Sequence, residues 1–222
     1  VSTTHSVVGG VMGAGIAAAG FAAVNWPTMY KIAASWVISP VLGGVVAALF
    51  LWFIKTRIVY QNDKIAAARR WVPFLVGIMG GAFAIYLALK GLKKVMKIDF
   101  SSALMIGLGM GLLIWLVMIP VIRKQSQGLE NRNKSLKKLF GIPLIVSAAL
   151  LSFAHGANDV ANAVGPLAAI VQASASGAFT DAISIPLWVM AIGALGITFG
   201  LFLFGPKLIR MVGGQITKLN PM

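Results

Sequence analysis

A cluster of polar side chains interrupts an apolar stretch of the chain at 152–166, where the sequence reads SFAHGANDVANAVGP. Asn158, Asp159 and Asn162 lie here, in a run from 139 to 206 that contains no lysine or arginine. Amide and carboxylate oxygens are ligands for hard cations. An ionisable group at membrane depth costs at least about 2.5 kcal/mol on insertion scales and therefore suggests a function. On a helix, Asn158 and Asn162 share one face with Asp159 beside them, so the spacing predicts an ion or solute site.

The residues around this cluster leave two interpretations open. The polar groups could instead serve only as hydrogen-bonding contacts between helices, and His155 fits either a structural hydrogen bond or a proton-carrying role in the site. Gly156 and the pair Gly165–Pro166 predict a helix break at each end of the cluster. A helix broken at mid-membrane exposes carbonyl and N–H groups together, which suits an ion and its co-ion.

A second candidate segment opens the chain with Ser2, Thr3, Thr4 and His5, followed by a glycine-rich run. Three consecutive hydroxyl side chains at a helix start can donate to an oxyanion, and the N–H groups of the first helical turn add further donors. A plain helix N-cap explains the same residues nearly as well. The segment alone therefore leaves a binding role and a capping role open.

The elements that must position these residues are membrane-embedded helices. Hydrophobic residues make up 59% of the 222 residues and charged residues 11%, with a mean hydropathy of +0.89. Lipid offers no partner for an unpaired backbone group, so the fold class predicted is all-α, a polytopic membrane helix bundle with about six membrane-embedded segments. Four uncharged stretches and two apolar stretches with internal polar residues make up the set: 33–54, 71–89, 100–122 and 182–206, then 1–30 and 139–180.

Within these segments, small residues recur at helical spacing. The pairs Gly9/Gly13, Gly77/Gly81, Gly107/Gly111 and Gly196/Gly200 predict close helix packing. Tryptophans such as Trp36 and Trp71 fall near predicted membrane surfaces and are interpreted as interfacial anchors.

The net charge of +14 is explained by loops between the segments, and not by a nucleic-acid partner. If the segments alternate, 14 lysines and arginines lie on the side of 55–70, 123–138 and the C-terminal tail, and five lie on the other side. The positive-inside rule places the richer side in the cytoplasm. The chain has no cysteine, which removes thiolate metal sites and disulfides.

GANDVANA at 156–163 closely resembles the hallmark of the inorganic phosphate transporter (PiT) family, and VSTTH at 1–5 resembles that family's second hallmark. The family has two inverted repeats, each with the first hallmark early and the second late, so the resemblance implies an inverted-repeat fold with broken helices. Here the order is reversed, which implies a central fragment of a longer transporter. Its expected parts are the end of repeat one at 1–122, a basic cytoplasmic linker at 123–138 and the start of repeat two at 139–222.

The resemblance also implies roles for the candidate residues. Phosphate would be bound by Ser2, Thr3, Thr4, Asn158 and Asn162, and cation coupling would involve Asp159, Asn158 and Asn162, with Na⁺ at Asp159 as the metal expected. His5 and His155 are candidates for a proton or site role. The implied partners are inorganic phosphate, co-transported Na⁺ or H⁺, membrane lipid and a second copy in a homodimer, without a cofactor. The expected location is a cell membrane crossed several times, such as a bacterial inner membrane.

Secondary active phosphate transport is thus the leading hypothesis, with two alternatives. One is a permease for sulfate or another oxyanion, because hydroxyl and N–H donors do not inherently separate the two. The other is a membrane scaffold subunit without transport activity. An enzyme is not expected, because an intramembrane protease would need a second embedded acid, or a Ser–His pair brought together across spans. The remaining acids fall in predicted loops: Asp63, Asp99, Glu130 and Asp181.

Overall fold

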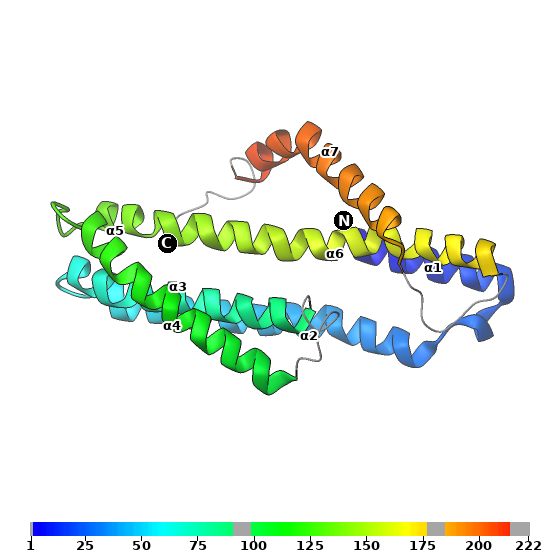
Figure 1. Cartoon of the computed structure of the whole chain (residues 1–222), viewed down its shortest axis with the longest axis horizontal. Helices are drawn as coiled ribbons and strands as arrows, with labels where there is room; N and C mark the ends of the chain where they lie inside the picture. Colours follow the sequence, from blue (N-terminus) through cyan, green and yellow to red (C-terminus); the bar gives the residue numbers. More distant parts are fainter. Residues whose placement is uncertain (1, 91–98, 177–184, 214–222) are drawn as a thin grey trace. The chain divides into compact units, whose positions relative to one another are not determined.

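The structure is a computed structural model that describes residues 2–90, 99–176 and 185–213. Every regular element in these ranges is a helix (Figure 1), as expected for apolar segments that must satisfy their own backbone hydrogen bonds in lipid. The α-helices are α1 (Thr3–Ala19), α2 (Trp26–Ile54), α3 (Lys64–Lys90), α4 (Phe100–Gln125), α5 (Asn133–Leu139), α6 (Gly141–Ser176) and α7 (Leu187–Met211), with a 3₁₀ turn η1 (Phe21–Ala23) and a π-helical turn η2 (Lys55–Val59).

Five of these helices are long and apolar enough to cross a membrane: α2 with its π-helical turn, α3, α4, α6 and α7. The prediction of a multi-pass helical membrane protein is therefore confirmed. The first of the six predicted segments, 1–30, differs from the others because it contains α1, η1 and the start of α2. The 17 residues of α1 span about 25 Å, which is shorter than a bilayer core of about 30 Å.

The chain divides into two compact units. One holds residues 40–150, and the other holds the described residues on either side of that stretch. The division falls within α2 and α6, whereas the basic segment 123–138 lies entirely inside the first of these units. The assignment of 1–122 and 139–222 to two repeats divides the chain by its motifs and not by contacts in space, and it stays a prediction.

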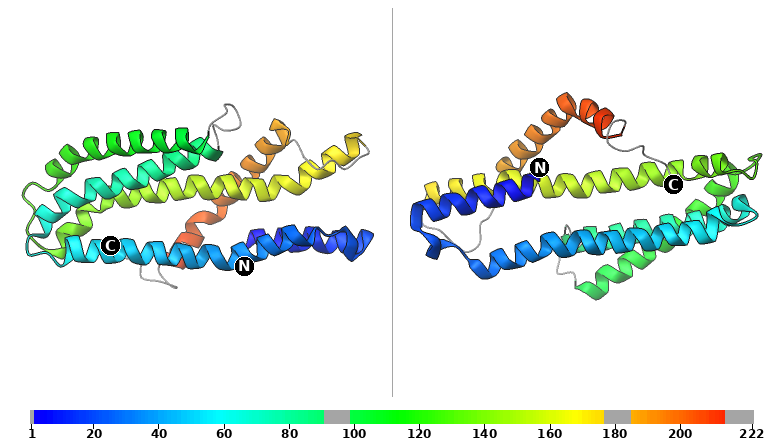
Figure 2. Two further views of the ribbon diagram at one scale, coloured as in Figure 1. Left: turned by 90° about the horizontal axis from the view of Figure 1, so that it is seen from below. Right: turned by 180° about the vertical axis from the view of Figure 1, so that it is seen from behind.

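Glycines bring α3 and α4 together in the unit formed by residues 40–150 (Figure 2). A Cβ atom placed on Gly81 would lie 2.7 Å from the carbonyl oxygen of Gly107, and one on Gly77 would lie 2.8 Å from that of Gly111. No side chain fits at such separations, so the two backbones are in direct contact. The predicted packing role is confirmed for these two pairs. At Gly9, Gly13, Gly196 and Gly200 an added Cβ would meet nothing within 4 Å.

At one end of the same unit, the two basic loops fold into a single structure. Ile58, Ile122, Leu136 and Leu139 are fully buried together in its core. Beside this core Arg69 donates through Nε to the Ser126 hydroxyl at 2.6 Å, and Ser126 is only 1% exposed. Asn131 then joins the loops: its Oδ1 accepts the N–H of Lys64 at 2.9 Å and its Nδ2 donates to the carbonyl oxygen of Asn62 at 2.5 Å. The segment 123–138 is therefore an ordered part of this unit.

In the other unit, α6 is one continuous helix of 36 residues. The predicted break at Gly156 and at Gly165–Pro166 is wrong. A glycine inside a helix costs only about 1 kcal/mol, and a proline removes one hydrogen bond, so neither compels a break when the helix continues on both sides. The helix is supported by α7, where Val189 packs against Val164 and Ala168, and Gly193 admits the Val164 side chain.

Candidate functional site

The hydroxyl segment forms the N-terminus of α1. Ser2 is the N-cap residue, with an extended backbone (φ −89°, ψ 122°), and its Oγ accepts the N–H of His5 at 3.4 Å. A serine hydroxyl in this position satisfies one of the backbone donors left without partners at a helix start. The capping role that the sequence left open is thus confirmed for Ser2, while Thr3 and Thr4 are the first two helical residues.

The first turn of α1 presents further donors. The N–H groups of Thr3 and Thr4 have no acceptor within the helix, because the first turn of any α-helix lacks a preceding turn. No acidic residue lies in this turn to compensate the positive end of the helix dipole. Thr3 is exposed and Thr4 half-buried. The turn can therefore offer two backbone N–H groups and the threonine hydroxyls to an anion.

A hydrogen bond brings the two candidate segments together. Asn162 donates through Nδ2 to the Thr4 Oγ1 at 2.8 Å, although the residues are 158 positions apart in sequence. Figure 1 shows the N-terminal end of α1 next to α6. Because the Thr4 hydroxyl accepts this bond, it keeps its own hydrogen to donate, and Asn162 keeps Oδ1 as an acceptor. Donors on α1 and an oxygen ligand on α6 thus meet at one place.

Asp159 lies one turn earlier on α6 and pairs with His155. The distance from His155 Nε2 to Asp159 Oδ2 is 3.1 Å, with 72% of the histidine side chain and 30% of the aspartate side chain exposed. The i, i+4 spacing on a helix accounts for the pair. Asn158 is exposed, and its side chain makes no hydrogen bond with another described residue. Among the residues of the polar cluster, the structure therefore joins Asn162 to α1 by a side-chain hydrogen bond to Thr4, and shows no such bond for Asn158 in the described part of the chain.

Two features of the site escaped sequence reasoning. The ring of His5 packs edge-on against Trp36, with 4.0 Å between ring centroids, so this tryptophan positions a site residue in addition to any anchoring role. The second feature is Pro166, which has no N–H to donate to the carbonyl oxygen of Asn162 four residues earlier. That carbonyl therefore lacks the N–H partner it would have in a regular helix, which makes it a candidate oxygen ligand beside Oδ1. The proline signal was visible in the sequence, but it was interpreted as a helix break.

The site thus has a donor side and an acceptor side. Thr3 and Thr4 supply hydrogen-bond donors at a positive helix end, while Asp159 and Asn162 supply oxygen atoms. In the described ranges no three or more His, Cys, Asp or Glu residues converge as a metal cluster. Such an arrangement can hold an oxyanion and a hard cation next to each other, each lowering the electrostatic cost of the other.

Known proteins share this architecture. The family model described as "Phosphate transporter family" matches residues 1–222. A Helicobacter pylori (strain J99) protein named "Putative phosphate permease" is 52% identical over 100% of this chain and 42% of its own length. The similarly named Pyrococcus furiosus protein is 32% identical over 99% of this chain and 53% of its own length.

A solved structure extends the likeness to three dimensions. The structure described as "The sodium-dependent phosphate transporter" matches with a TM-score of 0.88 and 32% sequence identity, covering 100% of this chain and 54% of that one. The chain spans about half the length of the relatives it matches. This partial coverage agrees with the expectation of a chain that holds one copy of each hallmark. By the match of the family model over its whole length, the chain belongs to the phosphate transporter family.

Proposed function

We propose that this chain carries a site for inorganic phosphate and a coupling cation in a secondary active transporter. The observation that carries the proposal is the 2.8 Å hydrogen bond from Asn162 to Thr4, which joins the hydroxyl segment to the polar cluster. A site of this kind needs hydrogen-bond donors for an anion and oxygen ligands for a cation within a few ångströms. The hydroxyl segment of α1 supplies the donors, and the polar cluster of α6 supplies the oxygen ligands.

Phosphate would bind at the first turn of α1. Its oxygen atoms would accept from the N–H groups and hydroxyls of Thr3 and Thr4, with the helix dipole favouring negative charge. The Ser2 hydroxyl accepts the capping bond from His5, so it also keeps its own hydrogen to donate. Charge-assisted hydrogen bonds to anions are stronger than neutral ones, which favours the dianion over water at this position.

The cation would bind on the α6 side. Oδ1 and the carbonyl oxygen of Asn162, together with the Asp159 carboxylate, form the oxygen set, with Asn158 able to join them by a change of rotamer. Because this set contains one carboxylate and neutral oxygens, it suits a monovalent cation. We propose Na⁺ as the coupling ion, supported by the sodium dependence stated for the matching solved transporter. The His155 ring lies 3.1 Å from the same carboxylate, so it competes with that ion for Asp159.

The test is Asp159→Asn in the complete transporter that contains this chain. Loss of the carboxylate removes the only formal negative charge of the cation set, so cation-dependent uptake of labelled phosphate is expected to fall to background. Membrane abundance is expected to stay unchanged. The matched control is Glu130→Gln, since Glu130 pairs with Arg132 on an exposed surface (side chain 69% exposed) and its loss should leave uptake intact.

Two outcomes would contradict the proposal. Uptake at the wild-type level in Asp159→Asn would remove the cation role, and a fall in protein abundance with normal uptake per molecule would favour the scaffold alternative. Competition by excess sulfate tests the remaining alternative, an oxyanion permease. The N–H and hydroxyl groups of Thr3 and Thr4 can donate to any tetrahedral oxyanion of suitable size. Equal inhibition by sulfate and by unlabelled phosphate would favour a general oxyanion permease.

A further inference from the structure

An aromatic series runs along the unit formed by residues 40–150, from α2 across α3 to α4. The ring centroids of Phe53 and Trp71 are 5.0 Å apart, those of Trp71 and Phe74 5.8 Å, and those of Phe74 and Trp115 6.1 Å. Trp71 follows the last basic residue of its loop and opens the uncharged stretch 71–89. The series therefore starts where α3 passes from the charged loop into its apolar part, at the level of a membrane surface.

Two arginines lie over the ring of Trp71. The guanidinium carbon of Arg70 is 5.3 Å from the ring centroid and that of Arg57 is 5.9 Å from it, both within cation–π range. Both side chains belong to exposed residues, whereas the neighbouring Arg69 is held by Ser126. Two like charges on one ring repel each other unless an anion compensates them.

The described part of the chain supplies no such anion. Its ion pairs are those of Arg132 with Glu130 and His155 with Asp159. The acid of the same loop, Asp63, is engaged as a helix cap, since its Oδ1 accepts the N–H of Ala66 at 2.9 Å. Arg57 and Arg70 thus form a positively charged pair without a carboxylate within ion-pair distance among the described residues.

An apolar groove is lined by the two rings that contact this tryptophan. It has a volume of about 160 Å³ and is lined by Leu49, Phe50, Phe53, Phe74, Leu75 and Ile78. Phe53 and Phe74 are the two rings that contact Trp71, so the groove and the arginine pair are adjacent. Its walls are open to the surroundings, with Phe50 41% exposed and Ile78 40% exposed. Exposed aromatic walls of this kind suit a hydrocarbon chain.

We propose that this surface binds an anionic phospholipid. The headgroup phosphate would lie between the guanidinium groups of Arg57 and Arg70, and an acyl chain would occupy the groove from Phe53 to Ile78. Guanidinium groups match phosphate oxygens in geometry as well as charge. The arginine pair and the groove together indicate the ligand class. A soluble phosphate would use the arginines only, and a neutral lipid would use the groove only. The lipid site shares no residue with the proposed transport site, and the proposal does not depend on it.

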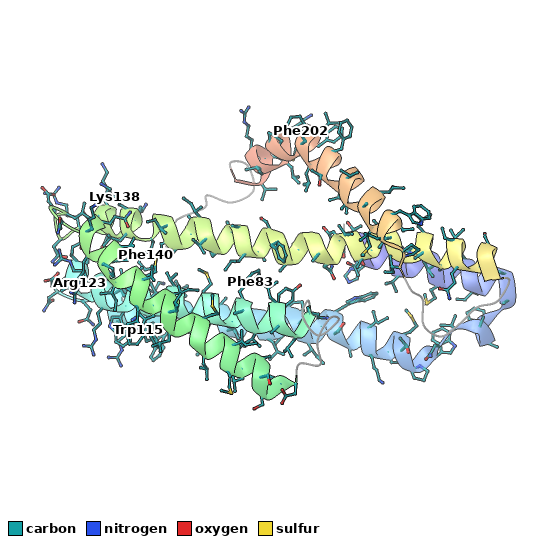
Figure 3. All side chains as sticks on the ribbon, viewed as in Figure 1. Phe83, Trp115, Arg123, Lys138, Phe140 and Phe202 are labelled. Atoms are coloured by element: carbon teal, nitrogen blue, oxygen red, sulfur yellow. The ribbon has the colours of Figure 1, made fainter. Side chains whose placement is uncertain are left out.

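The test uses the complete purified transporter and an equimolar mixture of phosphatidylglycerol and phosphatidylcholine, with retained lipids counted by native mass spectrometry. Wild-type protein is expected to retain phosphatidylglycerol preferentially. Arg57→Gln with Arg70→Gln should reduce the apparent affinity for phosphatidylglycerol by roughly 30-fold, because each basic residue near an anionic surface contributes about fivefold. The matched control is Arg123→Gln with Lys124→Gln, which removes the same charge from the end of α4 (Arg123 is labelled in Figure 3).

Three results would overturn the proposal. Equal losses in the two double variants would show a general charge effect, and stabilisation of the wild type by free glycerol phosphate to the same extent as by the lipid would show a soluble-anion site. Absence of any phosphatidylglycerol preference in the wild type would mean that another segment of the full-length protein covers the groove. If the double variant does not fold, Arg70→Gln alone tests the same point, because Arg70 is the closer of the two, and it should show a smaller loss in the same direction.

Discussion

The contact between α3 and α4 and the contact between α1 and α6 use similar residues for different purposes. Between α3 and α4, glycine removes side chains so completely that a Cβ on Gly81 would lie 2.7 Å from a carbonyl oxygen across the contact. Near the α1–α6 contact, Gly9, Gly13, Gly156 and Gly165 have nothing within 4 Å of an added Cβ. The hydrogen bond that joins the two helices there is between the side chains of Asn162 and Thr4.

This difference separates a structural contact from a site. At the α3–α4 contact the two backbones touch directly, and the groove of about 530 Å³ beside them is lined by glycine and apolar or aromatic side chains, without a carboxylate, amide or hydroxyl side chain to bind an ion. The α1–α6 contact leaves donors and acceptors half-exposed around one hydrogen bond, and open polar groups of this kind are what a transported ion requires. The same small-xxx-small spacing occurs in both regions, so the spacing alone does not tell them apart.

The largest effect on stability is expected from Gly81→Ala. Its methyl group would force apart the backbones of α3 and α4, and overpacking of this kind typically costs about 1–3 kcal/mol. The matched control is Gly13→Ala in α1, which meets nothing within 4 Å and should be neutral or slightly stabilising because alanine favours a helix. Thermal unfolding of the purified transporter measures both. Equal destabilisation by the two substitutions would contradict the distinction between the regions.

A smaller effect is expected from the hydrogen bond of the site. A double-mutant cycle of Thr4→Val and Asn162→Ala should give a coupling free energy of about 0.5–1.5 kcal/mol in unfolding. Thr198→Val is a suitable control, since the Thr198 hydroxyl donates only within its own helix, to the carbonyl oxygen of Ala194 at 2.8 Å. It should show no coupling with Asn162→Ala. Additive effects of Thr4→Val and Asn162→Ala would mean that the two helices do not depend on this bond.

The smallest effect concerns the cap of α4. The Ser102 hydroxyl and backbone N–H donate to Asp99, and these hydrogen bonds lower the pKa of its carboxyl from the ordinary value of 3.8. A lowered pKa in the folded state means that the carboxylate contributes stability above pH 3.8 and loses that contribution as the pH falls. Asp99→Asn should remove this pH-dependent part of the unfolding midpoint. The cap of α1 is the neutral Ser2, so Ser2→Ala should leave the acid dependence unchanged.

Much of the fold could be read from the chain. Long apolar stretches predict spanning helices because a backbone in lipid must satisfy its own hydrogen bonds, and α2, α3, α4, α6 and α7 confirm this. The bounds of α1 and the continuity of α6 could not be predicted. Glycine and proline change the local free energy by only a few kcal/mol, and at Pro166 the helix on both sides outweighs that cost.

The site was predicted as a set of residues and only partly as an arrangement. Asp159, Asn162 and Thr4 were identified by their types and local spacing, and the i, i+4 pair of His155 with Asp159 follows from helical geometry. The binding roles of these residues stay predictions, as do those of Ser2, Thr3, Asn158 and His5. The position of Trp36 against His5 could not be anticipated, because no local pattern links residues on different helices.

The sequence by itself determined the membrane environment, the helical class and the family, and it supplied the polar residues of the proposed site. These follow from local composition and from motifs that act over a few residues. The tertiary structure decided that Gly77 and Gly81 meet Gly107 and Gly111, and that Asn162 reaches Thr4. Each of these contacts joins segments far apart in the chain, and its partner depends on the packing free energy of whole helices. A local pattern determines which face a helix can pack, but the packing free energies of all the helix faces together determine which of them meet.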